Sequence, residues 1–306
     1  MSKHFNKTPL RYPGGKSKLT PFILELLVEN NISGHYVEPY AGGAGVGIQL
    51  LLSKKVNHIH LNDSDFGIYA FWHSVLNKNE EFCDMVAGAS MTVKEWRRQQ
   101  EIFRKGDKRK KLEVGFSVFY LNRCNRSGIL NAGVIGGLDQ TGNYKMDARF
   151  SRNDLIRRIE TIGVYKDKIS ISNFDAEYYI KNYIPNLPEN DTLIYLDPPY
   201  YEKGGDLYLN AYSKSDHTQL ANVIQREIKH KWVLSYDGVL EILNLYEKRR
   251  HFLYDLQYSV NKVYKGKEVF VFCDKLKLPL KCQLNYIEEG MHNIVNPQKE
   301  DLHWVL

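Results

Sequence analysis

Residues 193–200 read LIYLDPPY, and this stretch decides how the rest of the chain is interpreted. Its first half is apolar and suits a buried strand, whereas its second half is an acidic residue followed by two prolines and a tyrosine. Each proline removes a backbone donor and fixes φ, so we expect the strand to end at Leu196 on a rigid ledge. The ledge offers the carboxylate of Asp197, the carbonyl oxygen of Pro198 and the flat ring of Tyr200. Two acceptors and a ring are suited to holding an aromatic amine by its exocyclic nitrogen.

Strand-like and helix-like runs alternate on both sides of this ledge. We expect strands at residues 36–38, 58–61, 169–171, 193–196 and 232–234, and helices at residues 46–52, 68–76, 176–183 and 220–228. Such alternation is typical of βα units around a mostly parallel sheet, so the predicted fold class is α/β. Near the end, residues 260–264 and 269–272 flank Lys265-Gly266-Lys267, which we interpret as the turn of a hairpin.

The alternation stops between residues 78 and 165. This segment is basic and rich in Arg, Asn, Gly and Tyr, with a helix-like run at 94–103 and a loop at 122–143. A long irregular stretch within a compact domain is uncommon unless it has a function or forms a subdomain. We therefore expect an inserted, mainly helical subdomain at 78–165, which selects the substrate. Residues 1–77 and 166–306 would then form the sheet domain.

The positive charge of the chain is concentrated in this insertion. The whole chain has 42 basic and 36 acidic residues, a net charge of +6, whereas residues 94–126 alone contain eleven basic and four acidic residues. Such an excess suits a polyanionic partner, because phosphate counterions are released on binding. A solvated helix face would give the same composition, so charge alone does not decide between the two interpretations.

A glycine-rich turn, residues 42–47, follows the first expected strand. Residues without a Cβ allow a ligand to approach the backbone at the carboxyl edge of a sheet. Asp63 ends the second expected strand, where a carboxylate can accept hydrogen bonds from both hydroxyls of a ribose. A plain loop and an ordinary carboxylate would explain either feature alone, but together they suggest a nucleoside-containing cofactor. The turn is not a strict dinucleotide fingerprint, because Ile48 occupies the place of the third glycine.

Composition and spacing exclude other classes of protein. Gly15-Lys16-Ser17 lacks the first glycine of a phosphate-binding P-loop, since Leu10 stands there. The chain has 306 residues, 43% of them hydrophobic and 25% charged, which is typical of globular proteins. No apolar run approaches the roughly 20 residues that cross a bilayer, and the N-terminus lacks the apolar region of a secretory signal. The four cysteines form no C-x-x-C pair and no metal-ligand spacing, so we expect reduced thiols in a cytoplasmic protein.

Together these stretches resemble motifs of the D12 class, or Dam-type, DNA adenine-N6 methyltransferases. RYPGGK at 11–16, VEPYAGG at 37–43, Asn62-Asp63 and DPPY at 197–200 resemble, in order, motifs X, I, II and IV of that family. FYLNR at 119–123, with Ser127-Gly128 after it, resembles the stretch that opens the target-recognition region. VLSYD at 233–237 resembles a later strand of the family, with Tyr236 in place of an asparagine. The resemblance covers residues 8–275, and the order of its motifs is that of the α group.

The resemblance implies a Rossmann-like fold with a seven-stranded, mostly parallel sheet, helices on both faces and a terminal antiparallel hairpin. It also implies S-adenosylmethionine as the methyl donor and S-adenosylhomocysteine as its product. Asp63 is then expected to hold the ribose, and Phe174 and Asp175 to lie near the adenine of the cofactor. The full set of implied cofactor-binding residues is Tyr12, Gly14, Gly15, Lys16, Glu38, Pro39, Tyr40, Ala41, Gly42, Gly43, Gly45, Asp63, Phe174, Asp175 and Asp197.

The implied catalytic residues are those of the ledge: Asp197, Pro198, Pro199 and Tyr200. The lone pair of adenine N6 is delocalised into the ring. When Asp197 and the Pro198 carbonyl oxygen accept hydrogen bonds from both N6–H groups, a pyramidal nitrogen is favoured, and its lone pair can attack a methyl group. Positioning and electrostatics therefore carry the step without a metal. Because N6 is occupied in base pairing, the adenine must leave the duplex.

The implied DNA-binding residues lie in the insertion: Asn122, Arg123, Asn125, Arg126 and Asn131. Arg, Asn and Gln side chains are those that read base edges. For Asn122 and Arg123, a structural role in satisfying buried carbonyl groups is an equally good interpretation.

We therefore expect a site-specific DNA adenine-N6 methyltransferase, monomeric and without a membrane partner, in a bacterial cell or a phage-infected host. Its partner is double-stranded DNA, and a cognate restriction endonuclease is a further candidate. DPPY alone leaves adenine in RNA and N4 of cytosine open as acceptors. A catalytically idle DNA-binding protein is the remaining alternative, although such a protein would have no need for Lys16, Asp63 and Asp197.

Overall fold

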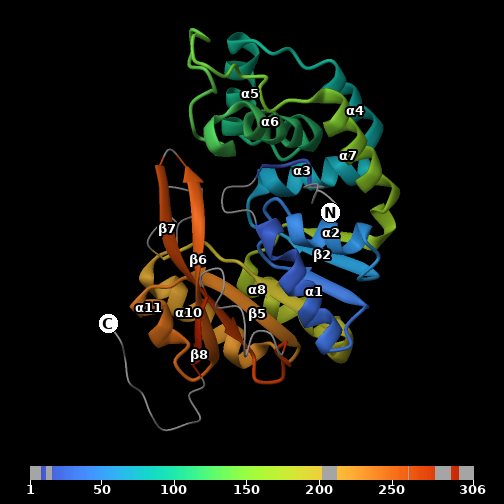
Figure 1. Cartoon of the computed structure of the whole chain (residues 1–306). Coiled ribbons are helices and arrows are strands. Elements are labelled where there is room, and N and C mark those ends of the chain that lie inside the picture. The colour runs from blue at the N-terminus through green and yellow to red at the C-terminus, as the bar shows by residue number, and fades with distance from the viewer. Residues whose placement is uncertain (1–7, 12–15, 202–211, 261, 280–290, 296–306) are drawn as a thin grey trace. The chain divides into compact units, whose positions relative to one another are not determined.

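The structure is a computed structural model that describes residues 8–11, 16–201, 212–260, 262–279 and 291–295 of the 306. The chain divides into two compact units (Figure 1). The first unit comprises Met1–Ile23 and Tyr36–Ala176, and the second comprises Leu24–His35 and Glu177–Leu306. Helix α1 (Thr20–Glu29) belongs partly to each.

The first unit contains one part of the expected alternation. Its strands are β1 (His35–Glu38), β2 (His58–Asn62) and β3 (Ile169–Ser172), in the order β3-β2-β1. β2 and β3 are parallel, with Ile59 opposite Ile169. Helix α2 (Gly45–Leu52) follows β1, and helix α3 (Phe66–Asn77) follows β2. Strand followed by helix is the rhythm that the apolar runs predicted.

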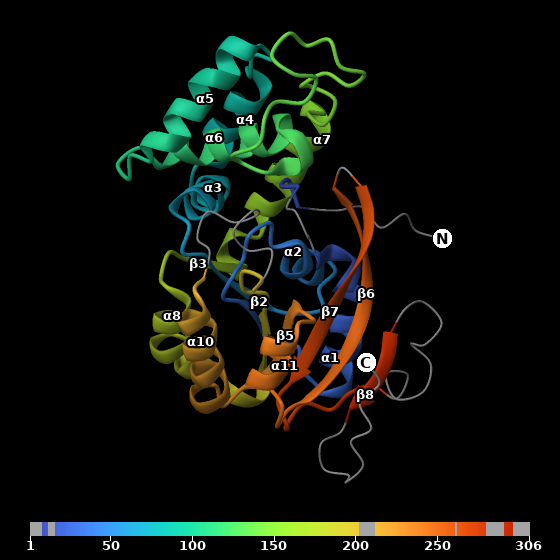
Figure 2. The same ribbon diagram turned by 90° about the vertical axis from the view of Figure 1, so that its left-hand side faces the viewer.

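Further helices of the first unit lie between α3 and β3 in sequence: α4 (Asn79–Ala87), α5 (Val93–Lys105), α6 (Lys111–Cys124) and α7 (Arg152–Val164). Figures 1 and 2 both show these helices grouped next to α3. Every residue of α6 from Val114 to Cys124 is buried. A Cβ on Gly115 would lie 2.5 Å from the carbonyl oxygen of Ala70, so α6 and α3 pack backbone to backbone. The segment is mainly helical, as expected, while its boundaries at 78–165 stay a prediction.

The second unit contains the remaining strands: β4 (Thr192–Leu196), β5 (Lys231–Asp237), β6 (Arg250–Val260), β7 (Lys262–Phe272) and β8 (Met291–Val295). Their order is β4-β5-β7-β6-β8. β4 and β5 are parallel, and the pairs β5–β7, β6–β7 and β6–β8 are antiparallel. Helices α8 (Ala176–Asn182), α10 (Lys214–Glu227) and α11 (Leu240–Leu245) complete its longer elements.

The α/β class and the terminal antiparallel hairpin are confirmed. Figure 2 shows β6 and β7 as the long pair of strands. The sequence predicted seven strands, whereas the described residues contain eight. The additional strand, β8, lies in the segment after residue 275 to which the sequence had assigned no structure.

The turn of the β6–β7 hairpin is not where the sequence placed it. The register pairs Val260 with Lys262, so the chain reverses between them and not at Lys265-Gly266-Lys267. Gly266 lies inside β7, opposite Leu256. Strand-forming residues continue through 256–264, and the pairing therefore extends through the glycine instead of ending there.

Helix α10 begins at Lys214, well before the expected start at residue 220. Its N-terminus has a capping box: the hydroxyl of Ser213 accepts the N–H of Asp216 at 3.3 Å, and the carboxylate of Asp216 accepts the N–H of Ser213 at 2.7 Å. These bonds satisfy two of the donors that a helix start leaves open. The prediction followed only the apolar residues and so missed the polar first turn.

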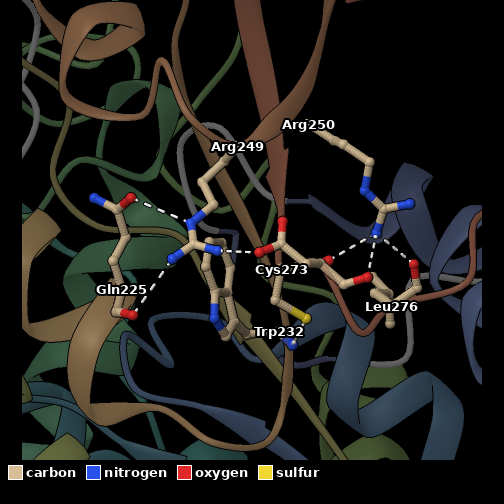
Figure 3. Close-up of polar contacts among 7 residues, drawn as sticks. Gln225, Trp232, Arg249, Arg250, Cys273 and Leu276 are labelled. Carbon is tan, nitrogen blue, oxygen red and sulfur yellow. Dashed lines mark hydrogen bonds and ion pairs between the residues drawn. The ribbon is translucent and has the colours of Figure 1, made fainter. Parts of the chain in front are cut away.

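Two adjacent arginines hold the segment that follows β7 (Figure 3). Arg249 forms an ion pair with Asp274. Arg250 donates from one guanidinium nitrogen to carbonyl oxygens of Cys273 at 2.8 Å and Leu276 at 2.6 Å. Both arginines stand at or next to the start of β6, so the chain leaving β7 is tied to the strand beside it.

Two expectations about the setting of the protein concern its helices and cysteines. No helix among the described residues is both long and apolar enough to span a bilayer. Cys83, Cys124 and Cys273 are buried, and burial raises the pKa of Cys83 to about 11 and that of Cys124 to about 12. Both are therefore protonated, unreactive thiols at neutral pH. Cys282 lies outside the described residues.

Candidate active site

The glycine-rich turn of the first unit is fixed from several sides. Gly42 has a φ of 44°, a left-handed conformation that suits glycine. Its N–H donates to Oδ2 of Asp63 at 2.9 Å, and its carbonyl oxygen accepts the indole N–H of Trp72 at 2.9 Å. The N–H of Ala41 donates to the carbonyl oxygen of Asn62 at 2.8 Å. The turn between β1 and α2 is thereby held against the end of β2.

Asp63 is half-buried directly after β2. Its Oδ1 accepts the N–H of Asp65 at 3.0 Å. Burial raises the pKa of Asp63 to about 7, the nearby Asp65 adds to the increase, and the backbone hydrogen bonds from Gly42 and Asp65 oppose it. Additional hydrogen-bond donors would stabilise the ionised form of such a carboxyl group. Ribose hydroxyls, the ligand that the sequence suggested for Asp63, are donors of this kind.

Asn62 joins three segments of this region, although the sequence analysis did not place it among the site residues. It is fully buried, and its Nδ2 donates to the carbonyl oxygens of Pro39 and Phe174, both at 3.0 Å. Its Oδ1 accepts the N–H of Phe174 at 3.0 Å and the hydroxyl of Ser172 at 2.8 Å. Asn62 therefore ties the chain after β1 and β3 to the end of β2. The signal was a polar residue closing an otherwise buried strand, because buried amides need partners.

Other expected cofactor contacts stand at the ends of β1 and β3. Glu38 is 4% exposed, and its Oε1 accepts the N–H of Gly47 at 3.0 Å, which fixes the first turn of α2. Tyr40 is half-buried. Phe174 and Asp175 are exposed and begin two residues after the end of β3, with 42% of Phe174 accessible. The carboxyl ends of all three strands of the first unit thus carry residues that the sequence singled out.

The N-terminal motif is described in part. Tyr12, Gly14 and Gly15 lie outside the described residues. Lys16 is buried at the start of a short helix, η1 (Lys16–Leu19), which contacts α2. A Cβ on Gly45 would lie 2.2 Å from the hydroxyl oxygen of Ser17, so this contact leaves no room for a side chain. The Lys16 segment, the glycine turn and the turn's partner Asp63 therefore come together.

The backbone at and just before the start of that motif is held by the end of α6. Asn122 accepts the N–H of Arg11 at 2.7 Å and donates to the carbonyl oxygens of Arg11 at 2.8 Å and Gly128 at 2.9 Å. Arg123 donates through Nε to the carbonyl oxygen of Pro9 at 2.7 Å. Burial, and then the nearby cations, lowers the pKa of Arg123 to about 9. These contacts show the structural role that the sequence had left open for Asn122 and Arg123.

The other expected DNA-binding residues divide into one buried and two exposed side chains. Asn125 is fully buried, accepts the indole N–H of Trp96 at 2.7 Å and donates to the carbonyl oxygen of Leu130 at 2.8 Å. Arg126 and Asn131 are exposed. Neither side chain makes a hydrogen bond to another described residue, so these two of the five can contact a bound molecule without losing one.

In the second unit, β4 ends at Leu196 as expected, and Asp197 follows at the start of the ledge. Asp197 is half-buried, and its Oδ1 accepts the hydroxyl of Ser235 at 2.7 Å. The hydroxyl oxygens of Ser235 and Tyr195 are 2.8 Å apart. β4 and β5 are parallel, with Leu196 opposite Leu234. Asp197 follows Leu196 and Ser235 follows Leu234, which brings their side chains within reach of each other. In the sequence, Ser235 belongs to the VLSYD stretch at 233–237, and nothing there predicts a role for it.

The two tyrosines after the prolines are also fixed by neighbouring strands. Tyr200 is 4% exposed, and its hydroxyl donates to the carboxylate of Glu268, a buried residue of β7. The N–H of Tyr201 donates to Oδ1 of Asp237 at 2.9 Å. Asp237 and Glu268 lie opposite each other in the β5–β7 ladder. Glu268 could not be predicted from the sequence, because a single acidic residue in a strand pattern has no distinguishing neighbour.

Tyr236 stands where the resemblance would have an asparagine, and it packs beneath the ledge. Its ring centroid is 6.5 Å from that of Tyr200, and its hydroxyl bonds to Nδ1 of His217 in α10. Burial raises the pKa of Tyr236 and lowers the pKa of His217. Both side chains are therefore neutral at pH 7, and the pair forms a neutral hydrogen bond inside the second unit.

The sequence model of one family, the D12 class N6 adenine-specific DNA methyltransferases, matches residues 12–272. The chain belongs to this family. As a D12-class methyltransferase it acts on N6 of adenine in DNA, and the matched range includes both the Asp63 region and the ledge. The methyltransferase has a Rossmann-like α/β fold, as the motifs implied.

The D12-class methyltransferase is also similar to individual proteins. The type II methyltransferase M.CviBI of Paramecium bursaria Chlorella virus NC1A is 23% identical over 247 residues, which are 76% of this chain and 84% of that protein. Among solved structures, the rRNA methyltransferase aviRa of Streptomyces viridochromogenes is 10% identical, with a TM-score of 0.37 over 85% of this chain and 86% of that chain. A second structure of aviRa gives a TM-score of 0.35.

Proposed function

We propose that this D12-class methyltransferase modifies adenine at a specific sequence of double-stranded DNA, with S-adenosylmethionine as the methyl donor. The observation that carries the proposal is the carboxylate of Asp197, which stands on the two-proline ledge and is held there by Ser235. A fixed acceptor beside a rigid carbonyl and a buried aromatic ring suits an exocyclic aromatic amine. Family membership supplies the acceptor, N6 of adenine.

The residues of the first unit fit the proposed cofactor. Gly42 adopts a left-handed φ, and a Cβ on Gly45 would collide with Ser17, so the turn presents backbone where larger residues would present side chains. The raised pKa of Asp63 indicates a carboxyl group that hydroxyl donors would stabilise in its ionised form. When bound, S-adenosylmethionine supplies a methyl group on a positively charged sulfur, which needs no metal or covalent intermediate.

We assign the cofactor contacts by part of the molecule. Asp63 is proposed to accept hydrogen bonds from the ribose, and Phe174 and Asp175 to border the adenine. Glu38 and residues 41–45 are proposed to lie beneath the methionine part. The remaining candidates are Tyr12, Gly14, Gly15, Lys16, Pro39, Tyr40 and Asp197.

In the proposed reaction, the ledge prepares N6 of adenine. Asp197 and the carbonyl oxygen of Pro198 accept hydrogen bonds from its two N–H groups, which favours a pyramidal nitrogen with an available lone pair. Tyr200 provides the stacking face, and its hydroxyl bond to Glu268 fixes the plane of the ring before a base arrives. As N6 would bond to the methyl carbon, the bond between that carbon and sulfur would break, and the methylated nitrogen would become acidic and release one proton to Asp197. Asp197 need not be a strong base, because the proton leaves only once the nitrogen has gained positive charge.

The proposal requires the adenine to leave the double helix. Its N6 is hydrogen-bonded to thymine there, and enzymes that act on such atoms extrude the nucleotide at a cost of a few kcal/mol. Stacking on an aromatic side chain returns about 1–3 kcal/mol per base. Arg126 and Asn131, the exposed candidates in the loop after α6, are proposed to contact the DNA around the extruded base.

Substitution of Asp197 tests the proposal directly. Asp197→Ala should lower methyl transfer more than about 10³-fold, because the acceptor that orients N6 is lost. Cofactor affinity should change less than about threefold, because most of the proposed contacts lie elsewhere. Tritiated-methyl incorporation into unmethylated double-stranded DNA measures the first quantity, and calorimetry with S-adenosylmethionine measures the second. Incorporation close to the wild-type rate by the variant would contradict the proposal.

Analysis of the product tests the acceptor. Digestion of methylated DNA to nucleosides followed by mass analysis should give N6-methyladenine, whereas N4-methylcytosine or label in RNA alone would overturn this part of the proposal. Long-read mapping of modified DNA from cells that express the protein should show one recurring sequence. The similarity to a type II methyltransferase supports a role beside a restriction endonuclease. Methylation at the recurring sequence would then protect the DNA from cleavage by that endonuclease.

A further inference from the structure

The structure shows a second layer of side chains behind Asp197. We propose that Ser235 is a positioning residue for Asp197, and that Tyr195 supports Ser235 in turn. The inference rests on the proposed function, because it concerns the carboxylate to which that function assigns N6. It adds two residues, neither of which is expected to touch substrate or cofactor.

The direction of the hydrogen bonds follows from counting hydrogens. An ionised carboxylate has no hydrogen to donate, so the 2.7 Å contact requires the hydroxyl of Ser235 to donate to Asp197. A serine hydroxyl has only one hydrogen, so at its 2.8 Å contact with Tyr195 it must accept. The chain therefore runs from the Tyr195 hydroxyl to Ser235 and from Ser235 to Oδ1 of Asp197. Each donor in such a chain polarises the next, which strengthens the final, charge-assisted bond.

The two supporting residues are as rigid as their position in the sheet allows. Ser235 is fully buried and Tyr195 is 3% exposed, so bulk water does not compete for their hydroxyls. Tyr195 is in β4 and Ser235 in β5, and the strands are paired from Leu193 to Leu196. Asp197, by contrast, stands beyond the last residue of β4, where the ladder no longer fixes it. The hydroxyl of Ser235 thus extends the constraint of the sheet by one residue.

This arrangement has a specific consequence for the proposed reaction. A carboxylate can rotate about its side-chain bonds, and a rotated Asp197 would present its oxygens in the wrong direction to N6. Holding one oxygen fixes the plane of the carboxylate and hence the direction of the acceptor. Small losses of orientation lower the rate of a positioned reaction steeply. Loss of Ser235 should therefore reduce the rate of the chemical step and leave binding almost unchanged.

The test compares three variants of the full chain in single-turnover methyl transfer to unmethylated duplex DNA. Ser235→Ala should lower the rate about 10- to 100-fold, the size expected for a lost hydrogen bond to a charged group. Tyr195→Phe, which removes only a hydroxyl, should lower it by a smaller factor, about 3- to 10-fold. Ser235→Thr, which keeps the hydroxyl, should recover most of the wild-type rate. The dissociation constants for S-adenosylmethionine and for DNA should stay within about twofold in all three.

Order in the chain gives a stricter outcome. In the Ser235→Ala background, Tyr195→Phe should have almost no further effect on the rate, because its path to Asp197 is already broken. Independent, multiplying losses would overturn the proposed chain. Ser117→Ala serves as the matched control: Ser117 is also fully buried, but its hydroxyl donates to the carbonyl oxygen of Val114 within α6, and its loss should not slow the reaction.

Two further results separate the inference from the function on which it rests. If the wild type methylates adenine and Ser235→Ala does so at the same rate, the positioning role is wrong and the proposed function stands. If the wild type transfers no methyl group to DNA, the proposed function fails, and the role of Ser235 in it fails with it.

Discussion

The carboxyl group of Asp63 makes the first unit sensitive to pH. Its pKa in the folded chain is raised to about 7, against an ordinary value of 3.8, mainly by burial. Between these values the folded state binds more protons than the unfolded state, so the contribution of Asp63 to stability is complete below about pH 4 and is lost as the pH rises through 7. Asp63→Asn should therefore raise the melting temperature of the free protein by about 2–4 °C at pH 8.5 and by less at pH 5.5. Calorimetric melting at the two pH values measures the difference.

The same variant should bind the proposed cofactor less well, which separates stability from function at one residue. The ionised carboxylate accepts hydrogen bonds from two hydroxyls, whereas the asparagine amide nitrogen cannot accept any. Wild-type affinity for S-adenosylmethionine should rise between pH 6 and pH 8, and that of Asp63→Asn should be lower and nearly independent of pH. A variant as tightly bound and as pH-dependent as the wild type would exclude Asp63 from the ribose site.

Single polar residues were also the hardest features to interpret from sequence. Asn122, Arg123 and Arg126 are of the types that contact bases, yet the first two satisfy backbone groups near the N-terminus. Nothing in the sequence separates them, because α6 is buried on all sides and so lacks the polar face that would mark its inward residues. Asp197 and Asp63 were identifiable because each follows a recognisable apolar strand.

Helix α5 carries exposed arginines of the basic insertion. Its buried residues are Trp96 and Gln99, while Arg97 and Arg104 are exposed and make no ion pair among the described residues. If α5 contacts DNA phosphates, replacing both arginines with glutamine should weaken binding of all duplexes alike. The slope of log affinity against log salt should fall by up to about 2, one for each lost phosphate contact.

The control for α5 is another exposed arginine, one that is already paired. Arg157 of α7 forms an ion pair with Asp154 at 2.5 Å, and Arg157→Gln should leave the salt slope unchanged. Methylation by the α5 variant should keep the same target sequence, because phosphate contacts carry no base information. An unchanged slope in the α5 variant would show that this face is merely solvated.

The predicted elements succeeded where burial imposes a period and failed where polar or backbone details decide. The strand that ends at Glu38 and the strands that Asp63 and Asp197 follow were predicted from apolar runs of a few residues, because a short apolar run is enough to indicate a buried strand. The start of α10 depends on Ser213 and Asp216, and the hairpin turn depends on how far pairing continues past Gly266. Neither is visible in an apolar pattern.

At the scale of the whole molecule, the chain extends beyond the range that the family model matches. That range ends at residue 272, whereas β8 (Met291–Val295) pairs with β6 through Leu253 and Tyr254. A chain that ends at Pro279 would leave this side of β6 as an open edge, which favours association between molecules. It should scatter more light on heating and melt several degrees lower, while freshly prepared protein keeps its rate of methyl transfer. Equal scattering by both chains would show that β8 does not protect the edge.

The motifs predicted functional residues in both units. In the first unit they named the turn at residues 41–45 and Asp63, and in the second the ledge at 197–200. The motifs did not predict the residues that fix these side chains and turns by hydrogen bonds, such as Asn62, Ser235 and Glu268. Supporting residues are defined by contacts between strands that are distant in sequence, so a single chain gives them no local signature.

The clasp of Asn122 and Arg123 on residues 9–11 bears on how new specificities can be engineered. Gly128 has no space for a side chain either, since a Cβ there would lie 2.2 Å from the carbonyl oxygen of Arg11. The helices that we expect to select the DNA sequence therefore cannot be exchanged on their own. A chimaera that exchanges them between relatives would also have to exchange the peptide at residues 9–11. Otherwise the new helices would lack the backbone groups that Asn122 and Arg123 bind.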